Sequence, residues 1–85
     1  MEHIFSIKYK NDVNKLIYQY NNLRETGYSC GVYSGVFDYY IADKLNIEYR
    51  TYKFHNIIDK WTNFLWLNDK NNILNTLNKF IDDNK

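Results

Sequence analysis

The sequence contains no proline, a single cysteine and three glycines among its 85 residues. One cysteine excludes an intrachain disulfide and gives no sign of secretion into an oxidising compartment. No stretch approaches the ~18 consecutive apolar residues of a membrane-spanning helix, and the first residues lack the apolar core of a secretory signal. These absences favour a soluble protein, and we predict a location in the cytoplasm of a host cell.

The chain also lacks an excess of either charge. Eleven basic and ten acidic residues leave a formal net charge of +1. This balance excludes the strongly basic composition of a dedicated duplex nucleic-acid binder, and it equally excludes an acidic mimic of DNA. A net charge close to zero is more typical of a protein that binds another protein.

No motif for catalysis, metal binding or cofactor binding is recognisable. The three glycines are spaced by four and precede no Lys-Ser/Thr pair, so they do not form a nucleotide-binding loop. Cys30 stands alone, while His3 and His55 are far apart in the sequence, whereas a metal site needs clustered ligands. We therefore predict that the protein is not an enzyme and that it carries no metal and no cofactor.

Aromatic residues are abundant, at 19% of the chain, and nine of them are tyrosines. Tyrosine combines apolar area with a polar hydroxyl, so a surplus indicates partly exposed aromatic surface or a small core that uses tyrosine in place of phenylalanine. Asparagine, lysine, isoleucine, tyrosine and phenylalanine are common, and their codons are AT-rich. This bias favours an AT-rich genome, such as that of a low-GC bacterium, of one of its phages or of a large DNA virus, and short compact chains of this kind are common among phage and mobile-element proteins.

Two segments near the N-terminus have clear periodicity. Residues 3–9 alternate between apolar and polar side chains, which predicts a half-buried strand. Residues 12–26 carry apolar side chains at helical spacing, with Asn11 or Asp12 as the N-cap and Gly27 as the terminating residue. A strand followed by a helix is therefore expected here.

Residues 28–53 are rich in tyrosine and β-forming residues, which favours a three-stranded antiparallel meander. Ser34-Gly35 resembles a two-residue hairpin connection, because glycine adopts positive φ readily. An alternative is helical, since Val36, Phe37, Tyr40, Ile41 and Leu45 also fit one stripe of a helix.

Two further helices are predicted after the meander. The first begins at His55 or Asn56, and its apolar stripe includes Trp61, which should be fully buried. The second is capped by Asn68 or Asp69 and carries a stripe over residues 73–81. The predicted fold is one α+β domain over residues 1–85, in the order β-α-β-β-β-α-α, with the helices packed on an antiparallel sheet.

The face of the meander that points away from the helices is the candidate binding surface. It combines tyrosine and arginine, which anchor protein–protein interfaces, with two carboxylates. An ordinary solvated sheet face has the same pattern. Trp66 lies opposite the stripe of its helix and either packs on the next helix or contacts a partner. The predicted partner-binding residues are Tyr33, Asp38, Tyr40, Glu48, Arg50, Tyr52 and Trp66.

The function that fits these features is binding to a larger macromolecule. We predict a small protein, encoded by a phage or mobile element, that occupies a surface of a host enzyme or of a ribonucleoprotein defence complex, for example an anti-CRISPR-type inhibitor. A self-associating homodimer is one alternative. A single-stranded nucleic-acid or RNA binder is another, with bases stacked on Tyr33, Tyr40 and Tyr52 beside Arg50.

The predicted order helix–three strands–helix superficially resembles double-stranded RNA-binding domains. In that family a lysine cluster opens the last helix, whereas this chain reads Phe54-His55-Asn56-Ile57 at the corresponding place. The resemblance therefore stops at topology, and no functional residue of the family is transferred to this sequence.

Overall fold

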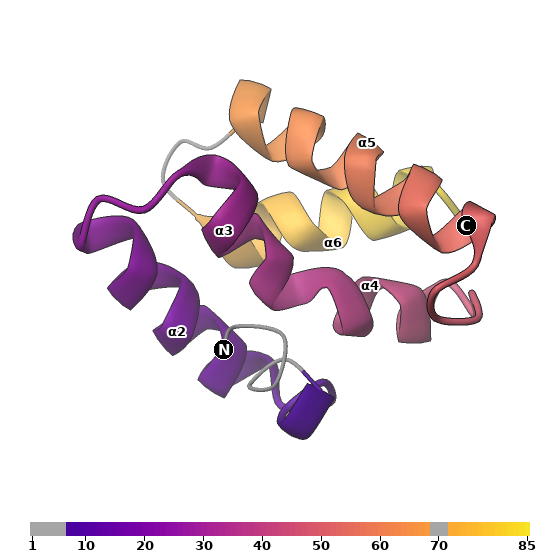
Figure 1. The fold of residues 1–85 in the computed structure, drawn as a ribbon, viewed down its shortest axis with the longest axis horizontal. Helices are drawn as coiled ribbons and strands as arrows, with labels where there is room; N and C mark the ends of the chain where they lie inside the picture. The colour runs from indigo at the N-terminus through magenta and orange to yellow at the C-terminus, as the bar shows by residue number, and fades with distance from the viewer. Residues whose placement is uncertain (1–6, 69–71) are drawn as a thin grey trace.

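The structure, a computed structural model, describes residues 7–68 and 72–85. Within these ranges all regular structure is helical. The elements, in chain order, are α2 (Val13–Glu25), α3 (Cys30–Ser34), the 3₁₀ turn η1 (Gly35–Phe37), α4 (Asp38–Lys44), α5 (Tyr52–Asn68) and α6 (Ile73–Asp83) (Figure 1). The predicted α+β fold is therefore wrong, because the described chain contains no strand.

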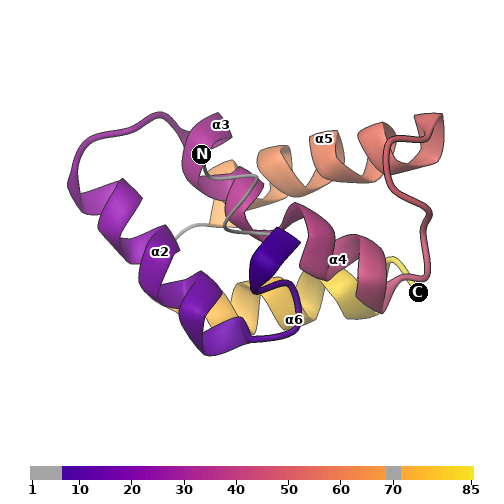
Figure 2. The same ribbon diagram turned by 60° about the horizontal axis from the view of Figure 1, so that its bottom comes forward.

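The segment α3–η1–α4 replaces the predicted meander and runs through the middle of the molecule. Helices α2, α5 and α6 surround it in both views (Figures 1 and 2). Every residue from 34 to 42 is buried as a result. A helix covered on all sides carries apolar residues on every side, so its sequence lacks the 3.6-residue apolar periodicity of a surface helix. The apolar residues of this segment are largely β-branched and aromatic, which are also the residues enriched in strands.

Two local predictions in this region fail for related reasons. Ser34-Gly35 is not a hairpin turn, because Gly35 has a helical φ of −63° and continues the chain from α3 into η1. The helical alternative for residues 36–45 is the correct one. The predicted strand over residues 3–9 lies mostly outside the described residues, and its described part includes a helical turn at Ile7 and Lys8.

The N-terminal helix agrees with the sequence prediction. Helix α2 begins after Asp12, whose side chain accepts a hydrogen bond from the Lys15 backbone N–H at 3.3 Å. At the other end Gly27 has a φ of +85°, a conformation that is unfavourable for a residue with a side chain. The Tyr28 N–H donates a hydrogen bond back to the Leu23 carbonyl. An acidic N-cap and a left-handed glycine therefore delimit this helix.

The two C-terminal helices were predicted with shifted starts. Helix α5 begins before His55, because the Thr51 hydroxyl accepts from the Phe54 N–H at 3.1 Å and acts as its cap. Helix α6 is capped by Asn72, whose side chain accepts from the Asn75 N–H at 3.2 Å. Asn68 belongs to the last turn of α5, and the alternative cap, residue 69, lies outside the described residues.

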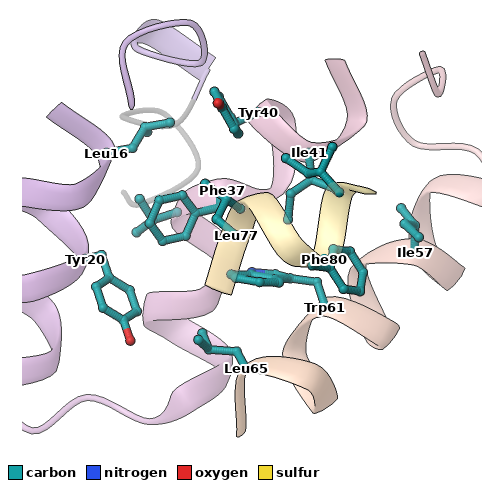
Figure 3. Close-up of a cluster of buried hydrophobic side chains, with 12 residues drawn as sticks. Leu16, Tyr20, Phe37, Tyr40, Ile41, Ile57, Trp61, Leu65, Leu77 and Phe80 are labelled. Atoms are coloured by element: carbon teal, nitrogen blue, oxygen red, sulfur yellow. The ribbon is translucent and has the colours of Figure 1, made fainter. Parts of the chain in front are cut away.

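Trp61 of α5 is fully buried, as predicted, and lies at the centre of the main core (Figure 3). Its ring centroid is 5.3 Å from that of Phe80 and 5.9 Å from that of Phe37. The indole Nε1–H donates to the Ser34 carbonyl at 3.0 Å. One side chain of α5 thus connects α6 to the central α3–η1 segment.

A second, smaller core lies at the far end of α4, where Tyr39 and Ala42 pack with Phe54. The inward side of α5 is therefore occupied along its length, from Phe54 to Leu65. None of the helices in residues 7–68 and 72–85 has both the length and the apolar composition needed to cross a membrane.

Candidate interaction surface

The predicted binding face does not exist as a sheet face, because three of its members lie on the central segment. Asp38 and Tyr40 are 5% and 9% exposed. Tyr33 is partly buried, with its ring edge-on to Tyr20 at 5.2 Å. The correction follows from the helical fold of residues 30–44, which turns these side chains toward the core. Their predicted partner contacts would need the helices around them to separate.

The other four predicted residues are exposed and lie along α5 and the loop before it. Glu48 and Arg50 belong to the loop, and Tyr52 opens α5. Trp66, in the last turn of α5, is 68% exposed. Of the two alternatives for Trp66, packing on the next helix is therefore wrong. These four residues therefore share one helix and the loop before it.

Thr51 holds the loop in place. Its hydroxyl donates to the Glu48 carbonyl at 2.8 Å and accepts from the Phe54 N–H at 3.1 Å. Between them Arg50 has a φ of +63°, a left-handed conformation that costs a residue with a side chain roughly 1–2 kcal/mol. Strain of this kind persists where the surroundings enforce it and often marks functional sites. Arg50 itself is exposed, two residues before α5 begins.

The side of α5 that faces away from the core forms a continuous stripe, which we call the α5 outer face. Its ends are apolar: Tyr52 is 83% exposed at the N-terminal end, and Leu67 is 71% exposed beside Trp66 at the C-terminal end. Fourteen residues of helix separate Tyr52 from Trp66 by about 21 Å along the axis. The exposed residues of this face are Tyr52, Lys53, His55, Asn56, Asp59, Lys60, Asn63, Trp66 and Leu67.

Leu67 is absent from the sequence-predicted set, although a signal for it was present. Core positions of α5 fall at Phe54, Ile57, Trp61 and Leu65, and Leu67 follows Leu65 by two residues. Two residues correspond to about 200° around a helix, so Leu67 must point away from the core. A large apolar residue on the solvent-facing side of an amphipathic helix indicates an interaction site when another exposed apolar residue adjoins it.

A second surface feature lies around Tyr9, at the N-terminal end of α2. The ammonium groups of Lys8 and Lys15 lie 5.3 and 5.2 Å from the centroid of the Tyr9 ring, within the range of cation–π attraction. A shallow pocket of about 470 Å³ opens here. It is lined by Tyr9, Asp12, Asn14, Lys15 and Tyr18.

The same pairing of lysine with tyrosine recurs next to α4. Lys10 donates to the Tyr49 hydroxyl at 3.1 Å, and this hydrogen bond raises the pKa of Lys10 above its ordinary value. Lys44 lies over the ring of Tyr40 at 5.4 Å. Asp43 and Glu48 line a neighbouring pocket together with Lys10 and Tyr49, so positive and negative groups alternate on this surface.

The most unusual group in the interior is Asp38. Its carboxyl is buried, and its Oδ1 atom has no hydrogen-bond partner. Burial raises the pKa of Asp38 from 3.8 to about 7, because a charge in an apolar environment is unfavourable. Over residues 7–68 and 72–85, no three His, Cys, Asp or Glu residues come close enough to hold a metal ion.

Cys30, Ser34 and Asp38 follow each other at four-residue spacing on the side of α3–α4 that meets α5. The hydroxyls of Ser34 and Thr62 are 3.2 Å apart, and the Cys30 thiol donates to the Thr62 carbonyl at 3.9 Å. These small polar groups allow the helices to pack closely. The line of contacts is a structural helix–helix interface, and Cys30 takes part in it.

Comparison of the chain with models of protein families, with curated proteins and with solved structures finds no match.

Proposed function

We propose that this chain is a non-enzymatic protein-binding protein and that its contact surface is the α5 outer face with the adjoining loop. The observation that carries the proposal is the exposure of three large apolar side chains, Tyr52, Trp66 and Leu67, along one helix. Large apolar groups on a rigid element are the usual anchors of protein–protein interfaces.

The rigidity of α5 supports this role. The opposite side of the helix is fixed by Phe54, Trp61 and Leu65, all buried. A partner would therefore meet side chains whose backbone is already ordered, which reduces the entropy lost on binding. Covering a Trp or Leu side chain contributes about 1.5–3 kcal/mol for a fully buried group, so Trp66 and Leu67 together supply the main apolar contribution.

Position-specific crosslinking tests the surface directly. A photoreactive phenylalanine analogue at position 66 should capture a protein in cells of the natural source, whereas the same analogue at position 18 should not. Tyr18 is the matched control, because its ring is 71% exposed and lies on α2. Equal capture from both positions, or none from position 66, would remove the α5 outer face from consideration.

Substitution provides the complementary test. The double variant Trp66→Ala plus Leu67→Ala should lose capture of the crosslinked partner, with an affinity loss of at least tenfold, since both side chains would be buried on binding. Tyr18→Ala should retain it. Because all three side chains are exposed, thermal melts of these variants should agree with that of the unsubstituted chain to within a few degrees.

Within this class, the specific version remains an inhibitor that occupies a host enzyme or a ribonucleoprotein defence complex. Its support is that the chain is short and nearly neutral and is rich in residues whose codons are AT-rich. Mass-spectrometric identification of the protein crosslinked at position 66 tests it, and a partner unrelated to host defence would refute this version while leaving protein binding in place.

A second candidate, nucleic-acid binding, is favoured by the lysine–tyrosine pairs around Tyr9 and Tyr49. Lysines that neutralise phosphates release counterions, so affinity should fall steeply with salt. Binding of a labelled oligonucleotide to the chain, compared with the variant Lys8→Gln plus Lys15→Gln, tests this candidate. A salt-independent signal, or one that the variant retains in full, would reject it.

A further inference from the structure

The pocket at the N-terminal end of α2 has the size and the wall chemistry of a small-molecule site. Its volume of about 470 Å³ lies within the range of roughly 300–1,000 Å³ that is usual for ligand pockets. Two of its walls are aromatic and the other three are polar or charged. The lining residues are Tyr9, Asp12, Asn14, Lys15 and Tyr18.

The two tyrosines of the pocket differ in what contacts their rings. The ammonium groups of Lys8 and Lys15 lie 5.3 and 5.2 Å from the centroid of the Tyr9 ring. Tyr18 is 71% exposed, and within residues 7–68 and 72–85 no other ring and no ammonium group contacts it. The Tyr18 ring is therefore the wall on which a flat aromatic ligand can stack, as nucleobases stack on tyrosine in many single-strand binders.

Two polar side chains lie next to Tyr18 on the same side of α2. Asn14 precedes Tyr18 by four residues and Lys15 precedes it by three, which places the Cβ atoms about 5–6 Å apart. The asparagine amide offers a donor and an acceptor together, the combination that matches the edge of a nucleobase. The lysine ammonium is a point charge suited to a phosphate group.

The charges around the pocket also favour an anion. Asp12 is the one acidic residue of its lining, and the Asp12 carboxylate accepts a hydrogen bond from the Lys15 backbone N–H at 3.3 Å. The ammonium groups of Lys8 and Lys15 lie on the Tyr9 side. Two cations against one carboxylate leave a positive charge at the place where a phosphate would lie.

We propose that this pocket binds a nucleoside phosphate, with the base stacked on Tyr18, its edge at Asn14 and its phosphate at Lys15. The inference goes beyond protein binding by the α5 outer face. For the nucleic-acid candidate it names one nucleotide position and the side chains that hold it. A free mononucleotide and a nucleotide within a single strand share this chemistry, and the experiment separates them.

Titration of the isotope-labelled chain with adenosine monophosphate (AMP), followed by nuclear magnetic resonance, tests the site. The backbone amide signals of Asn14, Lys15 and Tyr18 should shift and saturate in the millimolar range, whereas those of Tyr52 and Trp66 should not move. Adenosine and inorganic phosphate should each bind at least fivefold more weakly, because each lacks one of the two contacts. Inorganic phosphate that binds as tightly as AMP would overturn the proposal.

Substitution separates the two contacts. Tyr18→Ala should weaken AMP binding at least fivefold and leave the binding of inorganic phosphate unchanged. Lys15→Gln should weaken AMP binding and leave the binding of adenosine unchanged. The matched controls are Tyr28→Ala, an exposed tyrosine outside the pocket, and Lys79→Gln on α6. Full AMP affinity in Tyr18→Ala, with a melting temperature equal to that of the unsubstituted chain, would overturn the stacking role.

A short single-stranded oligoadenylate distinguishes the source of the nucleotide. Tighter binding than AMP, with shifts at the same amides, would assign the pocket to a strand, and equal binding would assign it to a free nucleotide. Oligoadenylate shifts confined to the residues around Tyr49 would overturn the pocket and leave the nucleic-acid candidate standing. No saturable shift with either AMP or the oligoadenylate would overturn the proposal, and capture of a protein from position 66 would be unaffected.

Discussion

Asp38 shows how a single residue can depart from the rule that buried polar groups are paired. The four-residue spacing places it between Ser34, which meets Thr62, and Ala42, which packs with Phe54. The α5 turn opposite this position carries His55 and Asp59, and both are exposed. The carboxyl thus lies between two packed contacts without a hydrogen-bond partner for Oδ1. An ionised carboxylate in this position is costly, and a protonated one is tolerated.

The buried acid predicts a stability that falls as pH rises. Its pKa of about 7 in the folded chain exceeds the value near 3.9 expected after unfolding. Its contribution to the free energy of unfolding is therefore fully present below about pH 4. It declines by about 1.4 kcal/mol per pH unit up to pH 7, and it is lost above that value. Urea denaturation between pH 4.5 and 8.5 measures this slope.

The control is Asp38→Asn, which keeps the shape of the side chain and removes its titration. All other ionisable groups are the same in the two proteins, so the difference between the two pH curves isolates Asp38. The variant should be more stable than the unsubstituted chain at pH 8.5 and show a flatter curve. Parallel curves for the two proteins would mean that Asp38 does not titrate in this range.

Trp61 is the residue whose loss should damage the fold most. Trp61→Ala should lower the free energy of unfolding by about 3–5 kcal/mol, since the side chain is fully buried between α6 and the central segment. Trp61→Phe should cost less, with part of its effect due to loss of the hydrogen bond to Ser34. Guanidinium denaturation measures both, and a smaller loss for Trp61→Ala than for Trp61→Phe would contradict the central position of this side chain in the core.

At the scale of elements, the loop before α5 combines a favourable cap with a strained residue. Thr51 satisfies the Phe54 N–H and the Glu48 carbonyl, while Arg50 has positive φ. The cap fixes where α5 begins, and the strained residue fixes how the loop approaches it. The two residues should therefore respond to substitution in opposite directions.

Thr51→Ala should destabilise the chain by about 1 kcal/mol, the usual cost of losing an N-cap side chain. Arg50→Gly should be neutral or stabilising by up to ~1 kcal/mol, because glycine adopts positive φ without steric cost. Thermal denaturation of the two variants side by side makes the comparison. If Arg50→Gly were the more destabilising change, the left-handed geometry of the loop would be incorrect.

The elements also differ in how far their sequences specify them. Helices α2, α5 and α6 each lie at the surface, so one side is apolar and the other polar, and this contrast makes them recognisable from residue spacing alone. The segment from Ser34 to Ala42 has no such contrast, because every one of its residues is buried. For a short segment of β-branched and aromatic residues, periodicity alone does not separate a buried helix from strands.

At the scale of the whole molecule, exposed aromatic side chains include Tyr18 and Tyr28 as well as those of two surfaces that differ in what covers the rings. Around Tyr9 and Tyr49, lysine ammonium groups lie over the aromatic rings. These rings therefore already have cation–π contacts within the chain. On the α5 outer face, Tyr52 and Trp66 extend into solvent. The second surface therefore offers more unburied aromatic area to a partner, and it carries the proposed function.

The sequence by itself determined the three amphipathic helices, the burial of Trp61 and the cap and glycine that bound α2, because these follow from local spacing and local hydrogen bonds. Only the tertiary structure decided the conformation of residues 30–44 and the exposure of Trp66. Both depend on which elements surround a segment. The predicted site divided accordingly: Asp38 and Tyr40 went into the core with the central helix, and Tyr52 and Trp66 remained outside because nothing in the described chain packs over the outer side of α5.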